Sequence, residues 1–432
     1  DDNPDVLLVI LDTVRRDHVT PCNPESNLTP QLEQFARTGT TFCRMVTPGS
    51  WTLPVHGSIF TGLLPRQHGA DFVDTRKAEL KMGEFWVNAL RDGLPTLAEI
   101  YAEAGYQTIL VSENPVLDPG TGITRGFEII RLGRSFEIEE GGSAFEFLEG
   151  IIEEYDRVSK PRFIVVNLSE AHEPYEKSTG EYRKIALFEK PTEESLFHRF
   201  VLDEMEPSEE KRFIRELREA YAIGVRKADE DFAEVLSLLR EYEWVDDGSL
   251  IAVTSDHGEH LGEYRLLDHG RSVHRVNNDV FAVIKLPNSR RIDEPVDRVV
   301  QSQDLFPTLL RWSGLEVPKN EYASDLFAPS GEGIAITTSE PDATWQKLTD
   351  GRLGRHFLLS LQRDELRVVR IDDREITGQR VPGLLPIEQP AEPPPDLAHA
   401  AEALEIKPLG EASPVEIDEE LRRTLKSVGY LE

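Results

Sequence analysis

Residues 5–11, DVLLVIL, form an almost unbroken apolar run, and the mostly polar residues 12–18, DTVRRDH, follow directly. A short run of this kind, rich in Val, Ile and Leu, is typical of a strand that is buried on both faces of a parallel sheet. Similar runs recur along the chain, at 107–112, 162–168, 249–255 and 280–285. They predict an α/β fold in which helices sandwich a large, mostly parallel sheet.

Helical periodicity fills several of the intervals between these runs, at 29–39, 94–105, 208–241 and 301–315. The pattern then changes. Residues 354–372 predict antiparallel strands, the Pro-rich residues 381–405 predict a linker with little regular structure, and residues 418–432 predict a final helix. We therefore expect a catalytic α/β domain over residues 1–340 and a small antiparallel C-terminal subdomain over residues 341–432.

The composition is strongly acidic, with 79 Asp and Glu residues against 48 Lys and Arg residues, for a net charge of −31. Only 13 of the basic residues are Lys, whereas 35 are Arg. This balance predicts a halophilic protein, because concentrated salt screens the self-repulsion, although an ordinary acidic surface is the alternative. Under either interpretation we expect no binding to nucleic acid or to anionic membranes.

Two further features bear on where the protein works. No run of about 18 apolar residues occurs, so we expect no transmembrane helix. The only cysteines, Cys22 and Cys43, are not spaced as a zinc or redox motif. We expect two thiols in a reducing, cytoplasmic environment, with a disulfide as the less favoured alternative.

Acidic and imidazole side chains follow three of the predicted strands. Asp12 ends the first, His172 follows the run at 162–168, and Asp256 and His257 end the run at 249–255. Because ligands gather at the carboxyl edge of parallel strands, these groups are expected to converge there. Each alone has an ordinary structural explanation, such as helix capping, but together they predict a divalent metal site.

Residues 49–69, GSWTLPVHGSIFTGLLPRQHG, predict a loop that leads into a helix with Pro54 in its first turn. Thr52 is therefore a good candidate for the N-cap. A hydroxyl at a helix N-terminus also lies where an anion is favoured, and a bound metal would make it a nucleophile. Both roles are compatible.

Six motifs resemble those of the sulfatase family in the alkaline phosphatase superfamily, in the same order and at similar spacing. They are LLVILDTVRRDH (7–18), WTLPVHGSIFTGLLPRQHG (51–69), HEPY (172–175), TSDHGEHLGE (254–263), LLDHGRSVH (266–274) and LKSVGYLE (425–432). The resemblance implies the fold predicted above. The acidic composition makes this chain similar to a haloarchaeal member.

The resemblance also implies roles for individual residues. Asp12, Asp256, His257 and the oxygen of Thr52 match the metal ligands, and Thr52 matches the nucleophile. Three further residues match the groups that surround the transferred group: His56 stands in place of an Arg, and His172 and His269 match a substrate-binding His and Lys. Arg15 and Arg16 follow the first strand and are expected on the solvated surface or at the rim of the site.

Sulfatases oxidise a Cys or Ser to formylglycine, but oxidation of Thr52 would give a ketone, so we expect no formylglycine cofactor. An imidazole ligand, His257, favours Mn²⁺ or Zn²⁺ over Ca²⁺ or Mg²⁺, and we expect one metal with a second possible. These departures favour a hydrolase or transferase of phosphate mono- or diesters over two alternatives. One is a sulfatase without formylglycine, and the other is an inactive binder of an anionic glycan or phosphate.

The substrate is expected to be a small anionic ester. Residues 176–207 resemble an insertion over the site that would set specificity. The natural substrate and the oligomeric state are left open by the sequence.

Overall fold

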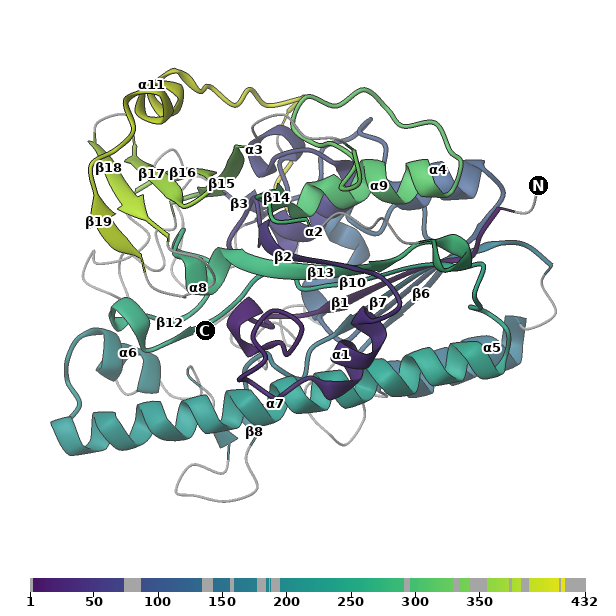
Figure 1. Ribbon diagram of the computed structural model, residues 1–432, viewed down its shortest axis with the longest axis horizontal. Helices are drawn as coiled ribbons and strands as arrows, with labels where there is room; N and C mark the ends of the chain where they lie inside the picture. Colours follow the sequence, from purple (N-terminus) through teal and green to yellow (C-terminus); the bar gives the residue numbers. More distant parts are fainter. Residues whose placement is uncertain are drawn as a thin grey trace.

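The computed structural model describes residues 3–73, 87–133, 143–155, 159–176, 184–185, 187, 195–290, 296–328, 334–341, 356–372, 375–381, 388–411 and 413–415. Figure 1 shows a large central sheet with helices on both faces and a second, smaller sheet formed by the C-terminal part of the chain. The predicted final helix at 418–432, which includes the LKSVGYLE motif, lies outside the described residues, as do residues 177–183, 186 and 188–194 of the predicted insertion at 176–207.

The central sheet confirms each of the five apolar runs as a strand. Its eight strands, in order across the sheet, are β14 (Val300–Gln301), β2 (Thr40–Val46), β13 (Asp279–Lys285), β10 (Leu250–Thr254), β1 (Val6–Leu11), β7 (Arg162–Leu168), β5 (Gln107–Ser112) and β6 (Ile129–Leu132). The pairs between β10 and β6 are parallel. In contrast, β13 runs antiparallel to both of its neighbours, β10 and β2. The sheet is thus mixed but mostly parallel.

Both faces of β1 are covered, which explains its unbroken apolar sequence. Leu7, Val9 and Leu11 contribute to the core on one face, whereas alternate residues contribute to the core on the other. The first core is closed by α1 (Pro30–Ala36), α5 (Ala144–Tyr155), α6 (Leu196–Val201) and α7 (Pro207–Glu241), and the second by α2 (Thr52–Thr61), α4 (Leu97–Glu103) and α9 (Leu305–Trp312).

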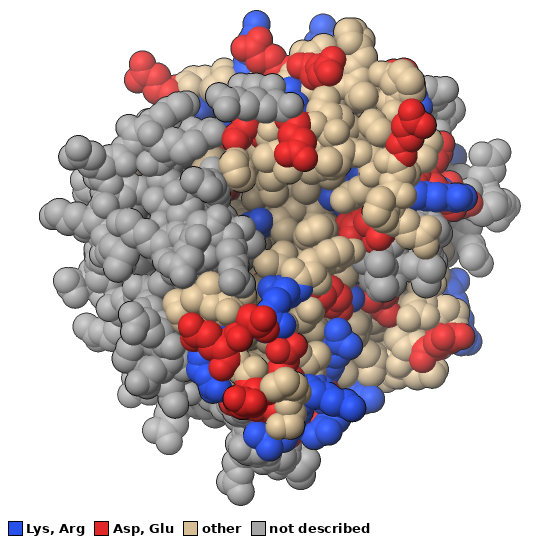
Figure 2. Space-filling view, turned by 90° about the vertical axis from the view of Figure 1, so that its left-hand side faces the viewer, with Lys and Arg blue, Asp and Glu red and all other residues tan. Residues whose placement is uncertain are grey.

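The helix predicted at 208–241 is confirmed as α7, which lies along the sheet in Figure 1 and buries most of its apolar side chains, although Ile223 is exposed. Its exposed side and the adjoining turns carry charges of both signs that pair with each other, as Arg199 does with Glu209 and Arg265 with Glu210. Figure 2 shows Asp and Glu interspersed with Lys and Arg on this end of the molecule. The acidic excess therefore does not produce a uniformly negative face there.

A five-stranded antiparallel sheet forms from the C-terminal part of the chain, with β16 and β17 confirming the prediction for 354–372. Its strands are β15 (Ala335–Ser339), β16 (Leu358–Arg363), β17 (Leu366–Ile371), β18 (Glu375–Arg380) and β19 (Gln389–Ala391). The expectation of little regular structure at 381–405 is wrong, because this segment supplies β19 and α11 (Pro395–Ala403). Leu397 and Ala401 of α11 are buried against the sheet, and this packing outweighs the Pro-rich composition.

Cys22 and Cys43 form a disulfide, so the expectation of two free thiols is wrong. The segment after β1 folds back onto β2, where Arg16 Nη1 donates to the carbonyl oxygen of Cys43 over 3.3 Å. This packing brings the two cysteine Cα atoms to 5.4 Å. Disulfides are typical of oxidising compartments, so the cysteines no longer support the predicted cytoplasmic location. Among the described residues, no helix is long and apolar enough to cross a bilayer.

Candidate active site

Asp12 directly follows β1 and is fully buried. Its Oδ2 atom accepts hydrogen bonds from two amide side chains, Asn114 Nδ2 at 2.7 Å and Asn167 Nδ2 at 3.2 Å. Within the described part of the chain, its Oδ1 atom has no hydrogen-bond partner. The two amides therefore fix the plane of the carboxylate and leave one oxygen directed at the neighbouring strand end.

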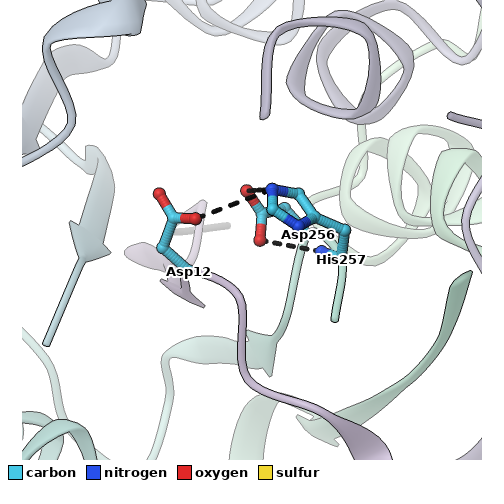
Figure 3. A group of neighbouring side chains, drawn as sticks. All are labelled: Asp12, Asp256 and His257. Carbon is cyan, nitrogen blue, oxygen red and sulfur yellow. Dashed lines mark hydrogen bonds and ion pairs between the residues drawn. The ribbon is translucent and has the colours of Figure 1, made fainter. Parts of the chain in front are cut away.

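Asp256 shows the same division between its two oxygens. Its Oδ1 atom accepts from the backbone N–H groups of Thr13, at 3.1 Å, and His257, at 2.8 Å. Its Oδ2 atom has no hydrogen-bond partner among the described residues. Figure 3 shows Asp12 and Asp256 approaching each other from different strand ends, with the His257 ring beside both.

The His257 ring completes this group. Its Nδ1 atom faces the carbonyl oxygen of Gly258 at 3.0 Å, so Nδ1 carries the proton and the lone pair of Nε2 faces the carboxylates. Nε2 lies 3.4 Å from Asp256 Oδ2 and 3.7 Å from Asp12 Oδ1. Burial lowers the pKa of His257 well below its ordinary value, which favours the neutral, ligating form.

These three residues, hereafter the metal-ligand cluster, fit a divalent cation. One atom from each of Asp12, Asp256 and His257 lies within 4.8 Å of the others. Burial, followed by the charge of Asp12, raises the pKa of Asp256 well above its ordinary value. Two buried carboxylates with one unpaired oxygen each are therefore unfavourable together until a cation binds between them. Oxygen and imidazole ligands together suit Mn²⁺ or Zn²⁺.

Thr52 lies beside this cluster as the first residue of α2. The expectation that it is the N-cap is off by one residue, because Trp51 holds the N-cap position in an extended conformation, with φ −160° and ψ 172°. The Thr52 hydroxyl is instead turned into the site. Its Oγ1 atom lies 3.2 Å from His257 Nε2 and 3.3 Å from Asn114 Nδ2.

His56 lies one turn further along α2 and is fully buried. Its Nδ1 atom is 3.0 Å from the carbonyl oxygen of Thr52, and its Nε2 atom is 3.2 Å from Asn167 Oδ1. Burial outweighs the charge of Asp12 and lowers the pKa of His56. Through these two contacts, His56 links the N-terminal turn of α2 to Asn167.

His269 follows β12 (Leu267–Asp268) and faces the metal-ligand cluster, with its ring centroid 4.3 Å from that of His257. Its Nδ1 atom lies 3.2 Å from Glu259 Oε1 and 3.0 Å from Asp268 Oδ1. Burial alone would lower the pKa of His269, but the two carboxylates outweigh it and raise the pKa to about 9. His269 is thus a cation at neutral pH.

His172 reaches the same area from the segment after β7. Its ring centroid lies 5.1 Å from that of His269, and its Nδ1 atom lies 2.6 Å from the carbonyl oxygen of Glu173. The structure therefore brings together all seven site residues singled out in the sequence, namely Asp12, Thr52, His56, His172, Asp256, His257 and His269.

A second buried group, Glu259, Asp268 and His269, also places its ligand atoms within 4.8 Å of one another. In this group, hereafter the ion-pair cluster, each carboxylate already contacts a positive or donating group. Asp268 contacts His269 and, over 3.3 Å, Arg271 Nη1. Glu259 contacts His269 and accepts from Tyr175 Oη over 2.8 Å. Protein cations balance its charges without a metal ion.

Three residues of the site were missed in the sequence: Asn114, Asn167 and Glu259. Asn167 had a detectable signal, because it is the one amide in the apolar strand FIVVNL. Asn114 follows β5 by two residues, at the same sheet edge as Asp12. The position of Asn114 after a buried strand was the feature of the sequence that could have identified it as a site residue.

The expectation for Arg15 and Arg16 is wrong, because both side chains are buried. Arg15 pairs with Asp17 at 2.8 Å and with Glu263 at 2.9 Å, and Arg16 pairs with Asp279 at 2.9 Å. Both arginines therefore hold the segment after β1 against its neighbours, which fixes the position of Asp12.

Comparison with known proteins identifies the family. The model of the sulfatase family matches residues 4–315. The chain belongs to the sulfatase family. A multifunctional alkaline phosphatase superfamily protein from Trinickia caryophylli, PehA, is 33% identical over 108 residues, which cover 24% of this sulfatase-family chain and 20% of PehA. The match thus spans about a fifth of the length of PehA.

Solved structures share the fold of this sulfatase-family chain. A phosphonate monoester hydrolase from Silicibacter pomeroyi has a TM-score of 0.63 at 19% identity, covering 87% of this chain and 89% of its own. The Agrobacterium radiobacter phosphonate monoester hydrolase has a TM-score of 0.62 at 17% identity, with coverages of 93% and 92%. A 2-O GAG sulfatase has a TM-score of 0.61 at 15% identity, with coverages of 89% and 87%. At these identities the likeness shows the fold alone.

Proposed function

We propose that this sulfatase-family chain is a metal-dependent hydrolase or transferase of phosphate mono- or diesters that uses Thr52 as its nucleophile. The observation that carries the proposal is the position of Thr52 Oγ1, 3.2 Å from His257 Nε2 at the N-terminus of α2. A hydroxyl there lies next to both the metal-ligand cluster and a helix end that favours anions. The phosphonate monoester hydrolase neighbours add support from the fold.

Asp12, Asp256 and His257, with Thr52 Oγ1, would hold the metal. A divalent ion bound by them supplies the positive charge that favours loss of the Thr52 proton and stabilises charge on the transferred phosphoryl group. Oxidation of Thr52 would not give formylglycine, so the proposed mechanism relies on an activated hydroxyl instead. One Mn²⁺ or Zn²⁺ ion is the expected cofactor.

The protein residues then carry out nucleophilic attack, charge neutralisation and proton transfer. Thr52 Oγ1 forms a bond to phosphorus while the bond from phosphorus to the leaving oxygen breaks. His269, held as a cation by Glu259 and Asp268, neutralises charge on the phosphoryl group and gives a proton to the leaving oxygen. His172 lies next to His269 for the same purpose. Neutral His269 then accepts a proton from water or an acceptor alcohol, whose oxygen forms a bond to phosphorus while the bond from phosphorus to Thr52 Oγ1 breaks.

Direct assay of three substrates tests this proposal. Bis-p-nitrophenyl phosphate, p-nitrophenyl phosphate and p-nitrophenyl sulfate are compared at saturating Mn²⁺ and Zn²⁺ with the wild type and with Thr52→Ala. We expect turnover of a phosphate ester and a loss of at least about 10³-fold in kcat for Thr52→Ala. Equal rates for wild type and variant would overturn the assignment of Thr52.

Other outcomes separate the alternatives. Turnover of the sulfate ester alone would favour a sulfatase without formylglycine, and no turnover would favour a binder of anionic glycan or phosphate. The halophilic character, the cytoplasmic location and the domain division at residue 340 stay predictions. The halophilic character would be supported if activity and stability rise as the KCl concentration is raised to about 1 M.

A further inference from the structure

Asn114 lies two residues after the end of β5 and is fully buried at the site. Its side chain is held in one orientation, because Oδ1 accepts from the backbone N–H of Val116 over 2.9 Å. The backbone carbonyl oxygen of Asn114 also accepts a hydrogen bond of 3.2 Å from Oγ of Ser112, the last residue of β5. The amide NH₂ group is therefore fixed toward the ends of β1 and α2.

The two hydrogens of this NH₂ group have two different acceptors. Nδ2 lies 2.7 Å from Asp12 Oδ2 and 3.3 Å from Thr52 Oγ1. An amide nitrogen has two donor hydrogens, so both contacts can exist at once. One links Asn114 to the metal-ligand cluster, and the other links it to the oxygen assigned as nucleophile.

From this geometry we propose that Asn114 is a catalytic residue that donates a hydrogen bond to Thr52 Oγ1 and stabilises the negative charge that develops on it. The inference rests on the proposed function, because it requires Thr52 to react. A fixed donor aimed at an oxygen that gains charge is effective in a buried site, since no solvent has to reorganise around it.

Asn114 would act in both halves of the reaction. In the first half, Oγ1 carries negative charge until its bond to phosphorus forms and the leaving oxygen departs with a proton. In the second half, water or an alcohol gives a proton to His269 and forms a bond to phosphorus, the bond from phosphorus to Oγ1 breaks, and the electron pair returns to Oγ1. The Asn114 hydrogen faces Oγ1 at both points.

Asn167 provides a matched control within the same site. It is also a buried amide, and its Nδ2 atom donates to the same oxygen, Asp12 Oδ2, over 3.2 Å. Its recorded contacts go to Asp12, Ser169 and His56, whereas Asn114 also reaches Thr52. Loss of either amide removes one support of Asp12, but only loss of Asn114 removes a donor to the nucleophile.

The experiment compares Asn114→Ala, Asn167→Ala and Thr52→Ala in the full chain, with Mn²⁺ at saturation and a phosphate diester as substrate. We expect Asn114→Ala to lower kcat by roughly 10²-fold with KM changed less than about 3-fold, as for loss of an oxyanion donor. We expect Asn167→Ala to lower kcat by less than about 10-fold. Calorimetric titration with Mn²⁺ should show similar losses of affinity for both variants, about 10-fold.

Acid-quenched single turnovers give a second readout. In Asn114→Ala, phosphothreonine at Thr52 should form and decay more slowly than in Asn167→Ala. If Asn114→Ala does not fold, Asn114→Ser is tested in its place, because its hydroxyl oxygen can still accept from the backbone N–H of Val116.

Equal losses of kcat in the Asn114 and Asn167 variants would overturn the role of Asn114. Full activity in Thr52→Ala would instead overturn the proposed function itself, so the two failures are distinguishable.

Discussion

The metal-ligand cluster and the ion-pair cluster contain the same kinds of side chain and lie in ring contact through His257 and His269, at 4.3 Å between centroids. Each has two buried carboxylates and one imidazole. In the metal-ligand cluster, Asp12 and Asp256 each keep one oxygen without a hydrogen-bond partner among the described residues. In the ion-pair cluster, His269 and Arg271 lie against the carboxylates.

The difference explains why only one of two similar sets of residues is suited to a cation. Burial makes a carboxylate costly unless something positive accompanies it. The ion-pair cluster supplies that charge from the protein, and its two carboxylates raise the pKa of His269 to about 9. Within the metal-ligand cluster no side chain supplies a positive charge, because burial keeps its imidazole, His257, neutral. Proximity of Asp and His alone does not distinguish the two, but the hydrogen bonds do.

The largest effect on activity is expected from a substitution that removes a residue of the metal-ligand cluster. Asp256→Asn keeps the Oδ1 acceptor for the N–H groups of Thr13 and His257 but removes one of two facing negative charges. We expect activity to fall by at least about 10³-fold, because the cation loses a charged ligand. Without metal the variant should be more stable than wild type, by about 1–2 kcal/mol, because a repulsion is relieved. Activity assays and urea unfolding in EDTA measure the two effects.

Asp268→Asn is the control for that variant. It removes a carboxylate from a cluster that is already balanced, so it should destabilise the metal-free protein, by about 2 kcal/mol, since His269 and Arg271 each lose one charged contact. Destabilisation of similar size in both variants would contradict the contrast between the clusters.

Metal removal sharpens the same comparison. A ligand present at about 1,000 times its Kd stabilises the native state by about 4 kcal/mol. We expect EDTA to lower the thermal midpoint of the wild type and Mn²⁺ or Zn²⁺ to restore it, because the cluster then gains its missing charge. In Asp256→Asn this dependence should be strongly reduced, and in Asp268→Asn it should persist. Differential scanning fluorimetry with and without EDTA provides the measurement.

The sequence was sufficient for five of the eight strands of the sheet and for the convergence of Asp12, Asp256 and His257 at its edge, because both depend on local patterns. Apolar runs predicted β1, β5, β7, β10 and β13, and the polar residue after a buried strand located Asp12 and Asp256. The antiparallel direction of β13 was not predictable, because a run buried on both faces has the same composition in either direction.

The contacts that separate the two clusters could not be predicted. Which oxygen of a buried carboxylate is hydrogen-bonded depends on residues distant in sequence, as it does for Asp12, whose Oδ2 atom accepts from Asn114 and Asn167. The same limit explains the error for Arg15, whose partner Glu263 is far along the chain. It also explains the disulfide, which depends on how the segment after β1 meets β2.

Asp71 illustrates a third way to bury a carboxylate, by retaining its proton. It lies in β3 (Asp71–Phe72), where Oδ1 accepts from Trp51 Nε1 and from the N–H of Phe72, each over 2.8 Å. Burial, with a smaller effect from Glu340, raises its pKa to about 7. Below that pH the folded carboxyl is neutral and requires neither a metal nor an arginine.

The smallest expected effect is the pH dependence that Asp71 introduces. In the unfolded chain the carboxyl loses its proton near pH 4, whereas the folded protein keeps it up to a pH of about 7. Between these values the native state binds more protons, so stability is greatest below about pH 4 for this group and falls as pH rises, by at most about 1.4 kcal/mol per pH unit. Asp71→Asn imitates the protonated form and should remove this slope while keeping the Oδ1 acceptor. Urea unfolding of both proteins at several pH values between 4 and 7 checks it, and an unchanged slope in the variant would show that Asp71 is already ionised in the native state.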